Sequence, residues 1–141
     1  MRRSIVTAVF LLVGLAPALA DVRILASPGG DVVQFLKLFE ILKHSGERII
    51  IDGPCYSACT LVLSEIPRNH ICVTSRAVLG FHAPRVVDQD GREYDASGAK
   101  RLIAATYPTA IRGWIDQHGG LAAKPILLRG RALAALYPRC G

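Results

Sequence analysis

Three consecutive isoleucines, Ile49–Ile51, most constrain what this chain can fold into. A run of β-branched residues of this kind is typical of a strand that is covered on both faces. A β-rich run at residues 22–26 ends at the turn residues 27–30, and residues 31–44 carry apolar side chains at helical spacing behind a capping Asp31. A strand, a helix and a second strand in this order predict a right-handed crossover and a largely parallel sheet.

The rest of the chain continues this alternation. Gly53 and Pro54 predict a turn, and the last residues before Cys140 repeat Leu and Ala without predicting a particular element. No internal repeat, low-complexity tract or linker interrupts the chain, so we expect a single small α/β domain. The further elements that we expect are a short helix, two strands, a loop or hairpin tip and two helices, at residues 56–65, 70–74, 77–82, 86–94, 97–106 and 108–118.

The first twenty residues have the pattern of an export signal. Two arginines precede a short apolar run, and Ala18 and Ala20 form the small-x-small pattern of a cleavage site. The apolar run is too short to span a bilayer comfortably. We therefore expect cleavage after Ala20, a domain formed by residues 21–141, and a periplasmic or secreted location. An uncleaved membrane anchor is the alternative.

The charge of the chain gives little support to nucleic acid as a partner. The formal net charge of +6 includes two arginines of the signal, which carries no acidic residue, so 6 − 2 leaves +4 for the domain. No block of lysine and arginine residues with interleaved aromatics occurs, as a nucleic-acid surface would require. The mild positive charge is that of an ordinary solvated surface or of a surface weakly attracted to anionic envelopes.

Four cysteines lie in the expected domain. In an oxidising compartment an even number of cysteines predicts disulfides, and four cysteines allow three pairings, all of which stay open. The last one would gain most from a bridge, because chain ends otherwise fray. A zinc site is the alternative, but Cys-x3-Cys and Cys-x12-Cys match no common zinc-finger spacing, so we predict no metal. The cysteines are Cys55, Cys59, Cys72 and Cys140.

A serine, a histidine and a glycine pair supply the groups that acyl-transfer chemistry needs. Ser57 precedes His82 by 25 residues, and a serine is a poor nucleophile at pH 7 unless an imidazole takes its proton. Gly29 and Gly30, together with Ala58, can donate backbone N–H groups to an oxyanion. The glycine pair and Ser57 follow predicted strands and His82 closes one, and ligands gather at the carboxyl ends of parallel strands. Each also has a simpler interpretation, as a helix cap, a structural histidine or a flexible turn.

Three motifs in this order resemble the ClpP-type serine peptidases of the ClpP/crotonase superfamily. They are Ser-Pro-Gly-Gly-Asp-Val at residues 27–32, Gly-x-x-x-Ser-Ala at residues 53–58 and Phe-His-x-Pro at residues 81–84. The resemblance covers roughly residues 22–84. The Cys-x-Ser-Ala-Cys segment at residues 55–59 is most similar to exported ClpP-like proteins of bacterial envelopes.

The resemblance implies a ClpP/crotonase-like β-β-α spiral with a mostly parallel sheet. It implies a serine hydrolase, a peptidase acting on peptides or unfolded protein segments. Ser57 would be its nucleophile and His82 its general base, with an oxyanion hole formed by Gly29 or Gly30 and Ala58. It implies no cofactor and a homo-oligomer as a candidate assembly. ClpP itself depends on an ATPase partner, for which this chain has no phosphate-binding loop, and the domain is short for the family, with an incomplete C-terminal part.

The third catalytic residue of the family has no counterpart here. It is an aspartate well after the histidine, and the corresponding residues 126–131 contain no acidic side chain. The aspartates that remain as candidates to orient His82 are Asp116, which is the last acidic residue of the chain, and Asp88, Asp90 and Asp95. A lysine partner for Ser57 is a further alternative, with Lys100 and Lys124 as candidates.

The missing acid keeps a second function open. A catalytically inactive ClpP-like binding or assembly module of the bacterial envelope would retain the fold without needing the aspartate. A crotonase-type acyl-CoA enzyme would use the same oxyanion hole, but it requires a nucleotide-bearing thioester that an exported protein would rarely meet. The fold alone does not decide between these functions, because the superfamily carries several chemistries on one scaffold.

Overall fold

The computed structural model describes residues 20–141. The predicted signal peptide lies outside the described residues except for Ala20, so cleavage after Ala20 stays a prediction. None of the helices between residues 20 and 141 combines the length and the apolar composition needed to span a bilayer.

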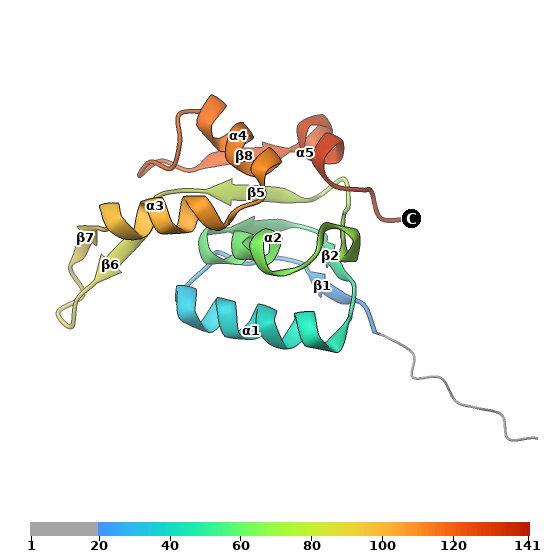
Figure 1. Ribbon diagram of the computed structural model, residues 1–141, viewed down its shortest axis with the longest axis horizontal. Coiled ribbons are helices and arrows are strands. Elements are labelled where there is room, and N and C mark those ends of the chain that lie inside the picture. The colour runs from blue at the N-terminus through green and yellow to red at the C-terminus, as the bar shows by residue number, and fades with distance from the viewer. Residues whose placement is uncertain (1–19) are drawn as a thin grey trace, which may run out of the picture.

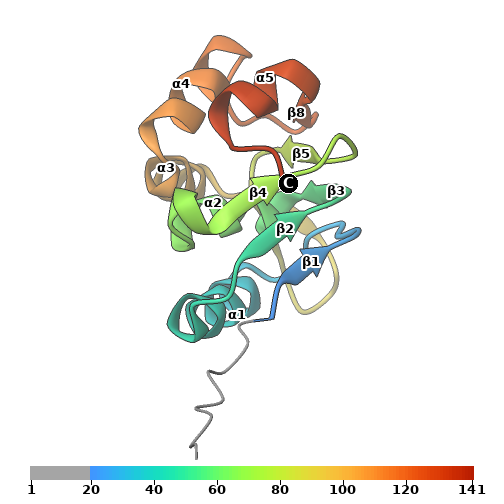
Figure 2. The same cartoon turned by 90° about the vertical axis from the view of Figure 1, so that its right-hand side faces the viewer.

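The first half of the domain follows the predicted strand–helix–strand order. Strands β1 (Val22–Ile24), β2 (Ile49–Ile51) and β4 (Ile71–Val73) form a parallel sheet in the order β1-β2-β4. Helix α1 (Val32–Ser45) connects β1 to β2 and lies to one side of the strands (Figure 1, Figure 2). These predictions are confirmed, including the buried isoleucine strand, because both ends of the helix carry strong local signals. The Asp31 side chain accepts a hydrogen bond from the Gln34 N–H, and Gly46 ends the helix at φ 73°.

A second sheet is formed by β3 (Pro54–Tyr56), β5 (Val78–Phe81) and β8 (Ile126–Arg129). Strand β3 pairs with β5 in parallel, whereas β8 pairs with β5 antiparallel. The sequence interpretation missed both outer strands. It took Gly53 and Pro54 as a turn directly into a helix, and it predicted no particular element in the tail that contains β8. The domain is therefore a small α/β domain with three small, partly parallel sheets rather than one mostly parallel sheet.

The helix predicted at residues 56–65 consists of two short pieces. It begins as the 3₁₀-helix η1 (Ser57–Leu61) and continues as the α-helix α2 (Val62–Glu65). A second 3₁₀ turn, η2 (Arg68–His70), leads into β4. Helix α1 packs against η1 and α2, so the segment that begins at Ser57 is held between α1 and the strands.

The third sheet is the antiparallel hairpin of β6 (Arg85–Val87) and β7 (Glu93–Asp95), which extends from one end of the domain (Figure 1). Its turn is closed by the Asp88 side chain, which accepts hydrogen bonds from the N–H groups of Asp90 and Arg92. Helices α3 (Ser97–Thr106) and α4 (Thr109–Gln117) follow as predicted. Helix α5 (Gly130–Leu136) occupies the leucine- and alanine-rich tail, for which no element was predicted.

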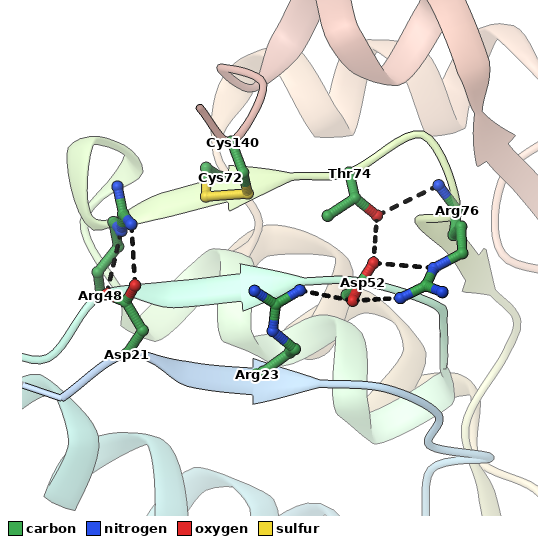
Figure 3. Close-up of a disulfide and its surroundings, with 8 residues drawn as sticks. All are labelled: Asp21, Arg23, Arg48, Asp52, Cys72, Thr74, Arg76 and Cys140. Atoms are coloured by element: carbon green, nitrogen blue, oxygen red, sulfur yellow. Dashed lines mark hydrogen bonds and ion pairs between the residues drawn. A yellow bond between two sulfur atoms is a disulfide. The ribbon is translucent and has the colours of Figure 1, made fainter.

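Two disulfides pair all four cysteines, Cys55 with Cys59 and Cys72 with Cys140. The second one ties the end of the chain to β4 (Figure 3). The Cys140 N–H also donates to the Val73 carbonyl over 3.1 Å. The chain end is therefore held against the first sheet by both a covalent and a backbone link.

A buried carboxylate links the three strands of the first sheet. Asp52 follows β2, its side chain is 3% exposed, and it accepts hydrogen bonds from Arg76, Thr74 and Arg23 (Figure 3). These donors, led by the Arg76 guanidinium, hold the pKa of the Asp52 carboxyl well below its usual range. Burial alone would raise that pKa, so the hydrogen bonds dominate.

Candidate functional site

A cavity of about 400 Å³ lies where the glycine turn, η1, the end of β5, the hairpin and α3 meet. Ser57 and His82 both line it, although they come from different parts of the second sheet. Gly30 and Ala58 are also part of its wall. The remaining lining residues are Val32, Thr60, Leu61, Pro84, Arg85, Val87, Glu93, Ile103 and Tyr107.

Ser57 has a strained backbone conformation. Its φ of 54° makes it the one non-glycine residue with positive φ among residues 20–141. Such a conformation costs on the order of 1–3 kcal/mol and persists only where the surrounding structure enforces it. The residue directly follows β3 and opens η1, which is the sharp strand-to-helix turn that presents the nucleophilic serine in many hydrolases.

The simpler interpretation of Ser57 as a helix cap does not describe its place. The cap of η1 is Tyr56, and no side-chain hydrogen bond caps that helix. Ser57 is one of the residues that line the cavity. Ser57 is therefore a residue of the cavity wall and does not cap the helix.

The Cys55–Cys59 disulfide spans the Ser57 turn. Ser57 is the central residue of the segment that it closes, and the Cα atoms of the two cysteines lie 5.3 Å apart. Both cysteines are buried in the main core. The bridge therefore restrains the backbone on both sides of the strained serine.

The glycine turn at residues 27–30 packs directly against this serine. Ser27 is held beside β3 because its N–H donates to Pro54 and its carbonyl accepts from Tyr56. Gly29, at φ 90°, comes so close that a Cβ on it would lie 2.5 Å from the Cβ of Ser57. The same added atom would lie 3.1 Å from the Ala58 backbone nitrogen. The structure thus brings together the glycine turn, Ser57 and Ala58, with Gly30 at the cavity wall and Gly29 packed against the Ser57 turn.

His82 directly follows β5 and is half-buried. Its Nδ1 lies 2.7 Å from the carbonyl oxygen of Ala83. Because a carbonyl oxygen only accepts, Nδ1 must donate, and the neutral ring then keeps Nε2 as its free acceptor. The hydrogen bonds of residues 20–141 do not include one between the Ser57 hydroxyl and His82. In enzymes that do use such a pair, the hydrogen bond is often long or poorly aligned before a substrate binds.

Three of the four candidate acids, Asp116, Asp88 and Asp90, do not line the cavity, and the side chain of Asp95 lies outside the described part of the structure. Asp116 is exposed on α4 and does not line the cavity. Asp88 binds the hairpin backbone and the Tyr94 hydroxyl. Neither of them, nor Asp90, is hydrogen-bonded to His82 in the described part of the chain. Lys100 and Lys124, the candidate lysine partners of Ser57, are exposed and are not among the cavity residues either.

The structure adds two buried hydroxyl groups that the sequence interpretation missed. The Thr60 hydroxyl donates to the Ser57 carbonyl over 2.7 Å and lies 2.6 Å from the Tyr107 hydroxyl. Both residues line the cavity. No sequence pattern points to them, because Tyr107 and Thr60 are separated by 47 residues and neither belongs to the three motifs of the resemblance.

The walls of the cavity are mostly apolar, and the charges at its edge are paired. Val32, Leu61 and Ile103 come from α1, η1 and α3. Arg85 and Glu93 face each other across the hairpin as an ion pair. Among the side chains that the structure describes, no group of three or more His, Cys, Asp or Glu residues is placed to hold a metal ion.

Comparison of the chain with protein-family models finds no matching family, and comparison with curated proteins finds no significant similarity. A functional assignment therefore depends on the residues of the cavity and on the chemistry that they allow.

Proposed function

We propose that this protein is an exported ClpP-like serine hydrolase, a peptidase that acts on peptides or unfolded protein segments. Ser57 is the nucleophile, His82 the general base, and the backbone N–H groups of Ala58 and of Gly29 or Gly30 form the oxyanion hole. One observation carries the proposal: the strained serine of a strand-to-helix turn lines the same cavity as His82.

The reaction would proceed through an acyl-enzyme. His82 Nε2 takes the proton of the Ser57 hydroxyl while Oγ attacks the carbonyl carbon of the scissile amide. The N–H groups of the oxyanion hole stabilise the negative oxygen of the tetrahedral intermediate. Collapse of this intermediate breaks the C–N bond, and the leaving amine takes the proton from His82. Water, deprotonated by His82, then hydrolyses the ester at Ser57.

The Ala83 carbonyl supports the role of His82 as a base. In a triad enzyme a carboxylate fixes the tautomer of the histidine and stabilises the imidazolium that forms. Here the carbonyl holds Nδ1 and thereby fixes the same tautomer. A neutral carbonyl stabilises an imidazolium less than a carboxylate does, so we expect a slower enzyme than one with a complete triad.

The cavity walls favour an uncharged, apolar group next to the scissile bond. The aliphatic side chains of Val32, Leu61 and Ile103 would contact such a group. Because Arg85 is already paired with Glu93, a charged substrate side chain would find no free opposite charge in that pair. The volume of about 400 Å³ lies within the usual range of small-ligand pockets.

The order of the elements supports the proposed spiral fold. Strands β2 and β3 follow each other almost directly but belong to different sheets, and η1 and α2 come next. Strands β4 and β5 repeat this step between the two sheets, with α3 and α4 after the hairpin. Two successive β-β-α units of this kind fit a ClpP/crotonase-like core. The two disulfides support an oxidising, extracytoplasmic location.

A catalytically inactive binding or assembly module is the second candidate. It is favoured by the partner of His82, which is a backbone carbonyl where the resembling enzymes have an aspartate. In this case the cavity would bind a peptide segment without cleaving it.

Covalent labelling with a fluorophosphonate probe separates the two candidates. We expect the wild-type protein to be labelled at Ser57, as read by mass spectrometry of the modified peptide, and Ser57→Ala to remain unlabelled. Ser75→Ala is the matched control, since Ser75 is exposed and does not line this cavity. Folded wild-type protein that is labelled no more than Ser57→Ala would favour the binding module.

A further inference from the structure

Tyr107 contacts two residues that adjoin the proposed catalytic pair: Thr60, near Ser57, and Phe81, next to His82. It lies between α3 and α4 and is 5% exposed. Its hydroxyl is 2.6 Å from that of Thr60, whose single hydrogen is donated to the Ser57 carbonyl. Tyr107 must therefore be the donor to Thr60, and the two hydrogen bonds run in one direction, from the phenol to the backbone of Ser57.

The ring of Tyr107 also supports the histidine. It packs edge-to-face on Phe81, with ring centroids 5.4 Å apart and an interplanar angle of 87°. Phe81 is fully buried and directly precedes His82. One side chain thus links the segment of the serine to the segment of the histidine.

The bond from Thr60 to Ser57 has a specific consequence for the oxyanion hole. The Ser57 carbonyl and the Ala58 N–H belong to the same planar trans peptide unit, so the direction of one determines the direction of the other. A hydroxyl that holds the carbonyl from one side therefore orients the N–H toward the opposite side. Together with the backbone of η1, the Thr60 hydroxyl thereby helps to fix the direction of the Ala58 N–H.

A threonine that bonds to a carbonyl three residues earlier is common in helices. This one differs because Thr60 is fully buried and is itself bound by a distant tyrosine. Polar groups in a dry environment have no water to replace a lost partner, so the loss of either hydroxyl is costly. The arrangement also acts on the one residue that the fold holds in a strained conformation.

We propose that Thr60 and Tyr107 are positioning residues. They hold the Ser57–Ala58 peptide in its oxyanion-binding orientation and fix the position of Ser57 relative to His82. The inference deepens the proposed function and rests on it. Burial raises the pKa of the Tyr107 phenol to about 12, so the hydroxyl remains a donor throughout the neutral range. We call the two hydrogen bonds from Tyr107 through Thr60 to the Ser57 carbonyl the relay. Its contribution to the labelling rate should be independent of pH in the neutral range.

Three substitutions test the relay through the rate of fluorophosphonate labelling at Ser57. Thr60→Val removes the hydroxyl at nearly the same shape, Tyr107→Phe removes only the phenolic oxygen, and Thr60→Ser retains the hydroxyl. We expect Thr60→Val and Tyr107→Phe each to lower the rate roughly tenfold, since small misplacements of reacting groups have effects of about this size or larger. Thr60→Ser should stay near the wild-type rate, and the double variant Thr60→Val/Tyr107→Phe should lose far less than the product of the two single losses.

The matched control is Tyr94→Phe, because Tyr94 is an exposed tyrosine that also donates a hydrogen bond. It should leave the labelling rate unchanged. The labelling rate of Tyr107→Phe should depend on pH with the same midpoint as that of the wild type, because the relay does not titrate in this range. Folded Thr60→Val and Tyr107→Phe proteins that label at the wild-type rate would overturn the inference. Should Thr60→Val fail to fold, Tyr107→Phe alone decides.

A second readout keeps the inference separate from the proposed function. The backbone chemical shifts of Ser57 and Ala58, measured by NMR in protein that has not been treated with the fluorophosphonate probe, report the conformation of this peptide directly. They should change in Thr60→Val and Tyr107→Phe but not in Thr60→Ser or Tyr94→Phe. A wild-type protein that is not labelled, together with these shift changes, would overturn the hydrolase while leaving the positioning role intact. Unchanged shifts in Tyr107→Phe would overturn the positioning role whatever the labelling shows.

Discussion

Gly29 and Ser57 are in such close contact that the glycine leaves no room for a side chain. An added Cβ on Gly29 would lie 2.5 Å from Ser57 Cβ and 2.7 Å from the Tyr56 carbonyl oxygen. The turn at residues 27–30 and the serine turn therefore form one packed unit. Glycine is required here by close approach as well as by its positive φ of 90°.

Gly29→Ala is predicted to abolish labelling of Ser57, because the methyl group would push the serine turn away from the glycine turn. The matched control is Gly91→Ala in the hairpin, since Gly91 has a similar φ of 79° but no atom within 4 Å of an added Cβ. That control should lose only about 1–2 kcal/mol in the free energy of unfolding and keep its labelling. Equal labelling rates for folded Gly29→Ala and the wild type would show that the contact does not matter for reactivity.

The Asp52 cluster predicts how stability depends on pH. The pKa of Asp52 is lowered in the folded protein, so the unfolded chain takes up the proton first as the pH falls. The stabilisation is thus present above the ordinary aspartate pKa of about 3.9 and is lost as the pH falls below it. Thermal unfolding of Asp52→Asn should occur at a lower temperature than the wild type at pH 7, and its midpoint should fall less between about pH 5 and pH 2.

Asp21→Asn is the control for this prediction. Asp21 also pairs with an arginine, Arg48, but both side chains are largely exposed, and such pairs contribute little to stability. It should change the pH dependence only slightly. Identical acid profiles for Asp52→Asn and the wild type would contradict the importance of the buried cluster.

The Cys72–Cys140 disulfide is predicted to contribute more to stability than the Cys55–Cys59 disulfide. The two bridges join residues that are 68 and 4 positions apart. In the chain-entropy account their contributions are about 4 and about 2 kcal/mol. Urea unfolding of Cys72→Ser/Cys140→Ser should show the larger loss in the free energy of unfolding. A larger loss for the short bridge would mean that the restraint of the unfolded chain is not the dominant effect.

The short bridge should matter more for reactivity than for folding. Removing it in Cys55→Ser/Cys59→Ser frees the backbone on both sides of Ser57, so the labelling rate of the folded protein should fall. Cys72→Ser/Cys140→Ser, below its unfolding transition, should keep the wild-type labelling rate because that bridge lies away from the cavity. The opposite order of labelling rates would count against a role for the Cys55–Cys59 bridge in the reactivity of Ser57.

Elements with strong local signals could be predicted from the sequence. Helix α1 has a capping Asp31 and a terminating Gly46, and the isoleucine strand has no alternative to burial. Gly30, Ala58, Ser57 and His82 line one cavity, as expected from the glycine turn and the Ser57 segment after predicted strands and from His82 at the end of another. Ser57 directly follows β3, however, whereas the isoleucine strand β2 was the strand expected before it.

The remainder depends on contacts that no local pattern encodes. Strand β3 has only three residues and exists because Pro54–Tyr56 pairs with β5. Strand β8 joins the same sheet from far along the chain and runs antiparallel. The partner of His82 is a backbone carbonyl, and every residue carries one, so the sequence could not reveal it. The disulfide pairing could not be predicted, because four cysteines allow three pairings and the sequence alone does not distinguish them.

The central claim is that His82 activates Ser57, and the rate of fluorophosphonate labelling at Ser57 in His82→Gln tests it most directly. His118→Gln is the matched control, since that histidine is exposed, stacks on Trp114 and does not line the cavity. We predict that His82→Gln slows labelling by about 10²-fold or more, as expected for the loss of a general base. His118→Gln should leave the rate unchanged. Folded His82→Gln protein that is labelled at Ser57 as fast as the wild type would contradict the account.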